Sequence, residues 1–323
     1  SATRGRFHPM KIFDAEATRQ ALPFRPLVDA LARMFVTGCE VPLRHTHAVQ
    51  ADDGSAGTVL IMPAWRSADY LGIKTVNVFP GNAQRGLSGL FATYVLYDVH
   101  TGEPLALIDG NEITSRRTAA ASALAASKLA RPDARRLLVV GAGRVASLLP
   151  EAYCAVLPID EIAIWARRPE AAEALAESLR ARGIDATAAA DLPHTAARAD
   201  IVSCATLATE PVVHGEWLRD GSHLDLIGSF TPQMREADDA CFRGASLYVD
   251  TDEAPQKSGE LLGPISRGVF ARADIRGTLA ELCSGRAAGR ADAAERTVFK
   301  SVGNALEDLA AAAMVYEGAI SRA

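Results

Sequence analysis

A glycine-rich turn between an apolar strand and a helix constrains the fold of this chain more than any other sequence feature. Within LLVVGAGRVA, Gly141, Gly143 and Ala146 form a G-x-G-x-x-A frame directly after a buried strand. The first glycine permits a tight turn, the second lets the backbone approach a pyrophosphate, and the alanine keeps helix and strand close. The start of the helix offers N–H groups and a positive dipole to phosphates. We expect this turn, with Arg144 and Val145, to bind a dinucleotide.

Strand and helix patterns alternate on both sides of this turn. Apolar strands are predicted over residues 135–140, 161–168, 199–206, 222–229 and 245–251. Helices are predicted for RTAAASALAASKLA, which ends before Pro132, and for PEAAEALAESLRARG, which has Pro near its start and Gly at its end. Continuous apolar strands that alternate with helices indicate a parallel sheet covered on both faces. The expectation is an α/β, Rossmann-type doubly wound dinucleotide-binding domain over residues 118–300.

The remaining sequence predicts a second domain of mixed α+β type. Short strands are expected over residues 58–65, 72–79 and 92–99, which are rich in Val, Ile, Tyr and Thr. Residues 297–321 carry apolar side chains at helical spacing and are interpreted as one long amphipathic helix. Such a terminal helix often packs back on the first domain. We therefore expect a discontinuous domain made of residues 1–117 and 301–323.

Composition excludes several classes of partner. The 323 residues carry a net charge of -5, which argues against a nucleic acid or an anionic membrane as a partner. No apolar run reaches the length of a membrane span, and the N-terminal segment has no signal-peptide pattern. The five scattered cysteines are interpreted as reduced thiols of a cytoplasmic protein. His45 and His47 lack further ligand-type neighbours, so no metal site is expected.

The end of the second strand of the predicted dinucleotide domain indicates the type of cofactor. An NAD site usually has Asp or Glu there, about 20 residues beyond the glycines. This chain has Trp165-Ala166-Arg167-Arg168 instead. Two arginines suit the additional phosphate of NADP, although they could also be solvated loop charges. NADP(H) is therefore favoured, and NAD(H) stays possible.

Several long motifs together resemble the ornithine cyclodeaminase/μ-crystallin family over nearly the whole chain. They are LGIKTVNVFPGN, TGEPLALIDGNEITSRRTAAASALAASKLA, VVGAGRVA, LYVDT, SGEL and TVFKSVGNALEDLAAA. The resemblance implies a nicotinamide enzyme, usually a homodimer. It further implies that residues 1–117 and 301–323 form a substrate-binding and dimerisation domain around the Rossmann domain.

The resemblance also implies roles for individual residues. Arg44, Lys74 and Arg117 match the family's substrate-binding cations, and Ser301 matches a position near the substrate and the nicotinamide. An α-carboxylate suits a planar two-pronged donor and a second cation, which agrees with these assignments. Residue chemistry alone does not choose between Arg116 and Arg117; the family frame chooses Arg117. Lys74 and Arg117 are the expected catalytic residues.

Two further residues are assigned to the cofactor site. These are Thr206 and Ser229, which end the predicted strands over residues 199–206 and 222–229.

Departures from the cyclodeaminase pattern separate this chain from that branch of the family. In the frame of this resemblance, the cyclodeaminases have an aspartate at the position of Phe230, a lysine at the position of Met234 and a pocket threonine at the position of Gly89. A phenylalanine cannot perform general acid–base chemistry. It suits a small apolar ring or simply closes the pocket. The GSFTPQM turn is similar to the branch that reduces cyclic ketimines, and Gly89 and Phe230 are expected to contact the substrate.

The preferred hypothesis is therefore NAD(P)H-dependent reduction of Δ1-pyrroline-2-carboxylate or Δ1-piperideine-2-carboxylate to L-proline or L-pipecolate. The alternatives are an ornithine cyclodeaminase that recycles bound NAD, an alanine dehydrogenase-like activity, and a non-catalytic NADPH-binding protein of crystallin type. His214, His223, Asp225 and Asp250 lie near strand ends and are expected to be structural.

Overall fold

The computed structural model describes residues 9–322, which form two compact units. The N-terminal segment, for which the sequence predicts no signal peptide, lies largely outside the described residues. The first unit runs up to Ala30 and takes in Thr37–Arg117 and the residues from Ala305 onward. The second unit takes in Leu31–Val36 and Thr118–Asn304. Residues 301–304, which we had expected in the first domain, are thus grouped with the second unit.

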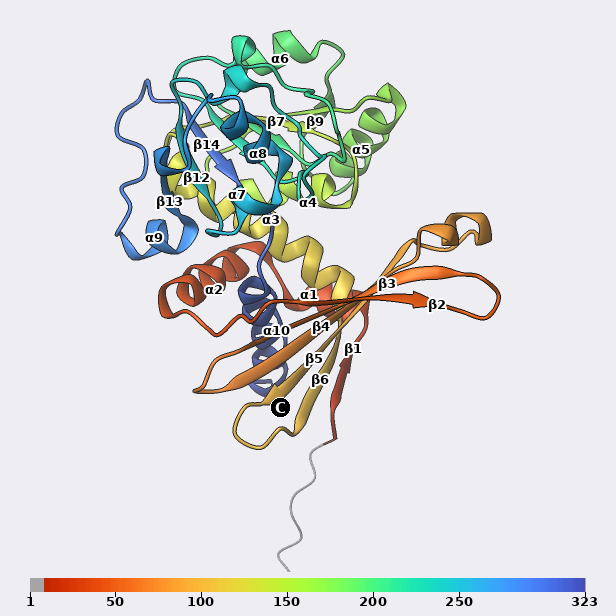
Figure 1. Cartoon of the computed structure of the whole chain (residues 1–323). Coiled ribbons are helices and arrows are strands. Elements are labelled where there is room, and N and C mark those ends of the chain that lie inside the picture. Colours follow the sequence, from red (N-terminus) through yellow and green to blue (C-terminus); the bar gives the residue numbers. More distant parts are fainter. Residues whose placement is uncertain (1–8, 323) are drawn as a thin grey trace, which may run out of the picture. The chain divides into compact units, whose positions relative to one another are not determined.

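The first unit is built on a mixed six-stranded sheet with the order β1-β6-β5-β4-β3-β2 (Figure 1). β1 pairs with β6 in parallel, and the other pairs are antiparallel. The strands are β1 (Lys11–Phe13), β2 (His45–Gln50), β3 (Ala56–Trp65), β4 (Tyr70–Val78), β5 (Leu90–Asp98) and β6 (Pro104–Asp109). The helices that begin or lie in this unit are α1 (Ala15–Ala21), α2 (Phe24–Thr37), α3 (Gly110–Leu129) and α10 (Ala305–Ile320).

Helix α10 contacts strands β3 to β6 and brings an Ala-rich apolar surface to the sheet. Strand β4 buries alternate residues, Gly72, Lys74 and Val76, as expected for a half-buried strand. A lysine therefore lies on the buried side of this sheet, among residues that are otherwise small or apolar.

The prediction of one continuous helix over residues 297–321 is wrong at its beginning. Thr297–Lys300 forms strand β14 in the middle of the second unit's sheet, and α10 begins only at Ala305. Gly303 separates the two elements with φ +88°, a conformation that favours glycine. The β-branched and aromatic residues of Thr297–Lys300 suit a fully buried strand, and each of them is buried.

The second unit contains eight parallel strands in the order β13-β12-β14-β11-β10-β7-β8-β9. They are β7 (Arg136–Val140), β8 (Glu161–Trp165), β9 (Ala186–Ala188), β10 (Ile201–Cys204), β11 (His223–Leu226), β12 (Ser246–Val249), β13 (Ile275–Thr278) and β14 (Thr297–Lys300). The helices that follow α3 are α4 (Arg144–Cys154), α5 (Pro169–Ala181), α6 (Leu192–Arg198), α7 (Ala254–Lys257), α8 (Gly259–Ser266) and α9 (Leu279–Ser284).

The spatial run β9-β8-β7-β10-β11 reproduces the first five positions, 3-2-1-4-5, of a doubly wound dinucleotide-binding sheet, and β14, the last strand of the chain, takes the sixth position. Every residue of β10, β11, β12 and β14 is buried, because both faces of the sheet are covered. The predicted fold class, a Rossmann-type domain combined with a mixed α+β domain, is confirmed. The strand order reverses between β7 and β10, where such sheets bind ligands at their carboxyl ends.

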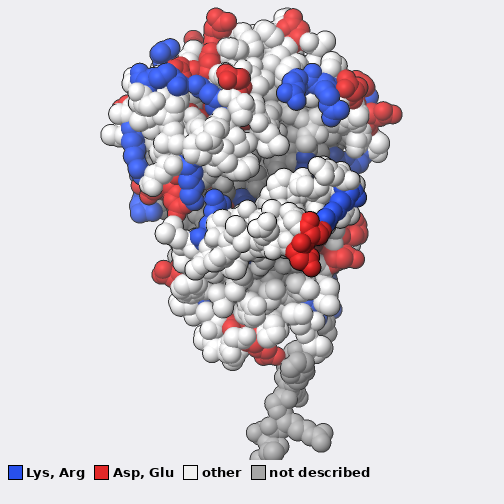
Figure 2. Space-filling view, turned by 45° about the vertical axis from the view of Figure 1, so that its right-hand side comes forward, with Lys and Arg blue, Asp and Glu red and all other residues white. Residues whose placement is uncertain are grey.

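On the face shown in Figure 2, acidic and basic side chains are interspersed. The charges on this face therefore do not favour anions in general. Among the described residues, no helix combines the length and apolar character needed to cross a membrane.

Candidate active site

The glycine turn after β7 has the geometry that a pyrophosphate needs. Gly141 adopts φ +126°, and a Cβ there would lie 2.5 Å from the carbonyl oxygen of Ala205. Gly143 is the N-cap of α4, no side chain caps this helix end, and a Cβ there would meet nothing within 4 Å. The start of α4 therefore has no side-chain cap and has room beside Gly143, which fits a dinucleotide phosphate. Arg144 and Val145 follow in the first turn of α4, and Ala146 is buried.

An open groove of about 630 Å³ begins at the carboxyl end of β8. Trp165, Asp191, Leu192, Val212 and Trp217 are among its lining residues. Because β8 pairs with β7 in parallel, with Trp165 opposite Val140, this end of the groove and the glycine turn lie at the same edge of the sheet.

Arg167 and Arg168 follow β8 after one intervening residue, Ala166, and both are exposed; Arg168 is the N-cap residue of α5. Arg168 accepts backbone N–H groups of α5 through its carbonyl. In the part of the chain that the structure describes, neither guanidinium has a hydrogen-bond or ion-pair partner.

Thr206 and Ser229 follow strands β10 and β11, and their hydroxyls already have protein partners. The Oγ1 of Thr206 donates to Glu236 at 2.8 Å. The Oγ of Ser229 donates to the carbonyl of Met234 at 2.5 Å and contacts the hydroxyl of Ser258 at 2.7 Å. Contacts from these two positions to a cofactor would therefore come mainly from the backbone.

Lys74 is a buried cation in the first unit. Its side chain is only 3% exposed, and its Nζ lies 2.8 Å from Oδ2 of Asp308 and 3.2 Å from Oγ1 of Thr114. Burial lowers the pKa of Lys74, and the neighbouring Arg117 guanidinium lowers it further, while the Asp308 carboxylate opposes the shift. Lys74 is thus a lysine whose ammonium releases its proton more readily than usual.

Arg117 contacts the same carboxylate from helix α3. Its Nε donates to Oδ1 of Asp308 at 2.8 Å, and its Nη1 donates to Oε2 of Glu307 at 3.0 Å. Burial alone would lower its pKa, but the carboxylates of Asp308 and Glu307 raise it above its usual value. Arg117 is therefore a permanent cation with a fixed guanidinium plane.

The neighbouring Arg116 has a different environment. It donates from Nε to the carbonyl of Leu22 at 2.9 Å, and its guanidinium lies 4.2 Å from the centre of the Phe24 ring. Arg117 shares the carboxylate of Asp308 with Lys74.

Asp308 is the functional candidate that the sequence analysis missed. It is completely buried in α10 and bridges Lys74 and Arg117. Burial would raise its pKa, but Lys74 and Arg117 hold it below the usual value, so the carboxylate is ionised. Two adjacent acids, Glu307-Asp308, directly before the apolar run of an Ala-rich helix were a signal that could have revealed it.

Arg44 and Gly89, also in the first unit, are both exposed. Arg44 directly precedes β2, whose first residue pairs with β3 next to Met62, and Met62 pairs with Lys74. The register thus places Arg44 nearly level with Lys74, two strands away, or about 10 Å between backbones. Gly89 accepts a 2.8 Å hydrogen bond from the N–H of Phe79 through its carbonyl.

Phe230, Met234 and Ser301 belong to the second unit. Phe230 is 52% exposed in the loop after β11, whereas Met234 is buried. Ser301 is buried directly after β14, and its N–H donates to the carbonyl of Leu226 at 3.1 Å.

The polar residues that we expected to be structural do have structural partners. His214 pairs with Asp238, and His223 with the hydroxyl of Thr297. Asp225 accepts hydrogen bonds from Tyr153 and Ser203, and Asp250 from the backbone N–H groups of residues 251, 302 and 303.

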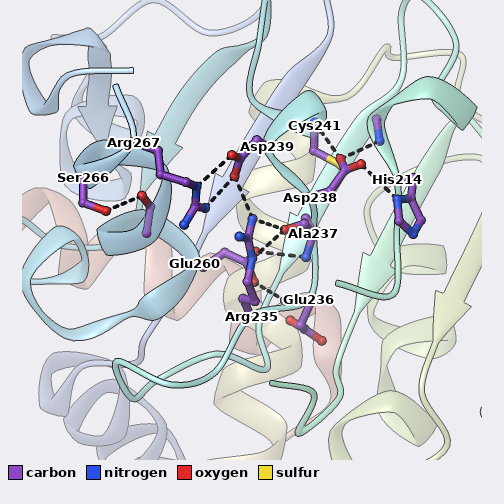
Figure 3. Close-up of polar contacts among 12 residues, drawn as sticks. His214, Arg235, Glu236, Ala237, Asp238, Asp239, Cys241, Glu260, Ser266 and Arg267 are labelled. Atoms are coloured by element: carbon purple, nitrogen blue, oxygen red, sulfur yellow. Dashed lines mark hydrogen bonds and ion pairs between the residues drawn. The ribbon is translucent and has the colours of Figure 1, made fainter. Parts of the chain in front are cut away.

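The loop that carries Phe230 is anchored by the SGEL motif, residues 258–261. Ser258 contacts Ser229, and a Cβ on Gly259 would collide with the carbonyl of Pro232. Glu260 accepts the N–H groups of Glu236 at 2.7 Å and Ala237 at 3.0 Å (Figure 3). Each of the first three residues of the motif thus contacts a residue within 229–237 and helps to fix that segment.

The two units therefore offer complementary chemistry. The first holds two buried cations of fixed orientation, which suit a small carboxylate. The second holds a dinucleotide-type turn at a helix start that no side chain caps. Together these features support binding of a carboxylate substrate and of a phosphate-containing cofactor.

Comparison with known proteins agrees with this description. Residues 19–323 match the ornithine cyclodeaminase/mu-crystallin family. The chain is 44% identical to a Δ1-pyrroline-2-carboxylate reductase of Paracoccus denitrificans over 80% of its length and 83% of that protein. It is 36% identical to the ketimine reductase mu-crystallin of Mus musculus over 87% of its length and 85% of that protein.

Among solved structures, the Δ1-pyrroline-2-carboxylate reductase of Thermococcus litoralis, in complex with NADH and L-proline, superposes with a TM-score of 0.88 at 32% identity. That match covers 97% of this chain and 98% of the other. An archaeal alanine dehydrogenase dimer with bound NAD superposes with a TM-score of 0.87 at 30% identity, covering 97% of both chains. On the extent and identity of these matches, the chain belongs to the ornithine cyclodeaminase/mu-crystallin family.

Proposed function

We propose that this protein reduces a cyclic ketimine carboxylate, Δ1-pyrroline-2-carboxylate or Δ1-piperideine-2-carboxylate, with a reduced nicotinamide cofactor. The observation that carries the proposal is the buried arrangement of Lys74 and Arg117 around Asp308. The reductases among the relatives support the same chemistry, and the product would be L-proline or L-pipecolate.

In the proposed reaction, the cations fix the substrate through its carboxylate. The guanidinium of Arg117 has five N–H donors in a rigid plane, and those not engaged by Glu307 and Asp308 can bind carboxylate oxygens. Lys74 contributes a second charge, and Arg44, the exposed cation at the start of β2, a third. When bound, the cofactor supplies hydride to the C=N carbon. Fixing the flat ring in one orientation is therefore the main contribution of these residues.

The proton for the imine nitrogen has two sources. Phe230 cannot supply one, and a ketimine that is protonated in solution arrives already activated. Lys74 is the second source, because burial lowers its pKa and makes its ammonium a better acid. The site therefore does not require the aspartate that cyclodeaminases carry at the position of Phe230.

The proposal is tested by following the loss of reduced-cofactor absorbance with both cyclic imines, beside an ammonia-release assay with ornithine. We expect imine-dependent oxidation of the cofactor and no ammonia from ornithine. Ammonia release without added reductant would instead identify a cyclodeaminase. Cofactor binding without turnover of either imine would identify a non-catalytic binding protein.

We further propose that NADPH is preferred over NADH. The support is that Arg167 and Arg168 are exposed beyond the end of β8 and that their guanidinium groups have no partners among the described residues. Replacing both by alanine is expected to weaken NADPH binding at least tenfold, because one charge-assisted bond contributes about 1.5–3 kcal/mol. NADH binding should change less than twofold. Fluorescence titration with both cofactors measures this, and equal losses for both would remove the phosphate assignment.

A homodimer is the proposed assembly. Large apolar side chains are exposed around the sheet of the first unit, at Val41, Leu43, Val49, Leu87, Leu90 and Phe91. Light scattering should give twice the chain mass of 34.2 kDa. Leu43→Glu is expected to shift the protein towards the monomer because it places a charge in an apolar interface. Leu207→Glu, an equally exposed leucine of the second unit, is the control. A monomeric wild-type protein would contradict the proposal.

A further inference from the structure

We propose that Glu236 is a positioning residue that holds the loops after β10 and β11 in the arrangement that binds the nicotinamide cofactor. The inference rests on the dinucleotide-binding part of the proposed function and not on the identity of the imine. Glu236 is completely buried, and it belongs neither to the glycine turn nor to the cation cluster of the first unit.

One carboxylate joins both loops. Oε2 of Glu236 accepts the N–H of Thr206 at 2.7 Å and its hydroxyl at 2.8 Å. Oε1 accepts the N–H of Gly228 at 2.7 Å. Both oxygens must therefore be acceptors, and only an ionised carboxylate provides two acceptor oxygens without a donor.

The two loops lie against the glycine turn and against each other. A Cβ at Gly141 would lie 2.5 Å from the carbonyl of Ala205, and a Cβ at Gly228 would collide with the carbonyl of Thr206. The three segments at the carboxyl ends of β7, β10 and β11 are thus in direct backbone contact. A shift of the loop at Thr206 or Gly228 would change the shape of the surface beside the glycine turn.

The backbone of Glu236 is itself fixed by a second buried carboxylate, that of Glu260. Glu260 of α8 accepts the N–H of Glu236, as Figure 3 shows, together with that of Ala237. A series of hydrogen bonds therefore runs from α8 through Glu236 to the loops after two neighbouring strands, β10 and β11. No part of it requires a contact between Glu236 and the cofactor.

The charged and titratable groups that face Glu236 make its protonation depend on pH. They are Lys300 of β14, Glu260 of α8 and the neutral thiol of Cys204 of β10. Burial raises the pKa of Glu236 to about 7; Lys300 opposes this shift, and Glu260 adds to it. Below pH 7 the carboxyl gains a proton, one oxygen becomes a donor, and the bond to one loop is lost. Cofactor affinity is therefore expected to fall as the pH falls through about 7.

The test compares Glu236→Gln with Asp239→Asn. The glutamine places an NH2 group against one of the two backbone donors and carries no charge that titrates. Asp239 is the matched control, because it lies in the same segment and pairs with Arg235 and Arg267 at the surface (Figure 3). Its pKa is held at about 2 by these arginines, so its charge is constant over the range tested.

The dissociation constant of NADH is measured by fluorescence from pH 6 to 9, beside the melting temperature of the cofactor-free protein. NADH is used because the additional phosphate of NADPH titrates near pH 6. We expect Glu236→Gln to bind NADH about tenfold more weakly at pH 8 and to lose the pH dependence of the wild-type protein. Asp239→Asn should stay within twofold of wild type and keep the pH dependence.

A lower melting temperature with wild-type NADH affinity at every pH would reduce Glu236 to a structural residue and overturn the proposal. If Glu236→Gln does not fold, the wild-type profile alone decides, and an affinity that does not weaken below pH 7 overturns it. Because NADH binding is measured without an imine, a failure of the proposed reaction is distinguishable from a failure of this inference.

Discussion

Replacing Arg117 by lysine is expected to lower kcat/KM for the cyclic ketimine about 100-fold, because the loss of one well-oriented charge-assisted contact costs about 2–3 kcal/mol. The substitution keeps the charge but removes the rigid plane of donors. Lysine cannot serve Asp308, Glu307 and a substrate carboxylate in the geometry that the guanidinium provides. Steady-state kinetics with a saturating cofactor measures the effect, which should appear mainly in KM.

The adjacent Arg116 is the control for this experiment. Both arginines are buried in α3, but Arg116 bonds to Leu22 and stacks on Phe24. Arg116→Lys should lower the melting temperature and leave kcat/KM within about threefold, since the contacts that it loses contribute about 1 kcal/mol to stability. Equal kinetic losses for the two variants would show that Arg117 acts only through folding.

Replacing Asp308 by asparagine is expected to produce the largest combined effect on stability and activity. The carboxylate is the shared partner of Lys74 and Arg117 in a fully buried position. Removal of one member of a buried ion pair costs about 3–5 kcal/mol. Here the buried ammonium of Lys74 loses its ion-pair partner, and Arg117 keeps only Glu307 among the described residues. Denaturant unfolding of the two proteins measures this difference in the free energy of unfolding.

The pH dependence separates the role of Asp308 in the site from its role in stability. The charge of Lys74 is lost as the pH rises through its pKa, which burial has already lowered. In the wild-type protein the Asp308 carboxylate opposes that shift, so Asp308→Asn should lower the pKa of Lys74 further. The alkaline fall of kcat/KM should therefore begin at lower pH in the variant. Glu317→Gln, an exposed acid on the same helix, should leave the alkaline fall where it is.

Asp308 also changes the interpretation of the missing aspartate at Phe230. From sequence, Phe230 leaves the site without the aspartate that cyclodeaminases carry at that position. The structure places an ionised carboxylate between the two buried cations instead, where it fixes their orientation. Phe230 is half exposed in a loop that the SGEL motif and Glu236 hold. Whether this position carries phenylalanine or the aspartate of cyclodeaminases is therefore a separate question from the chemistry around Lys74.

The sequence by itself determined the dinucleotide-binding half. The glycine frame, the apolar strands and the Ala-rich helices are local patterns, and the conformations that they require follow from turn chemistry and chirality. The reversal of strand order beside Gly141 then follows from the doubly wound arrangement. Lys74 has a local signal of the same kind, because it is a lysine inside the otherwise apolar predicted strand over residues 72–79.

Only the tertiary structure decided the positions that depend on distant partners. Thr297–Lys300 is a strand because β11 and β12 pair with it, and this pairing overrides the helical pattern of its sequence. Arg116 and Arg117 are neighbours with equal chemistry, and packing alone turns one towards Phe24 and the other towards α10. Asp308 meets Arg117 across 191 residues of chain, a distance over which local sequence preferences carry no information about which side chains will meet.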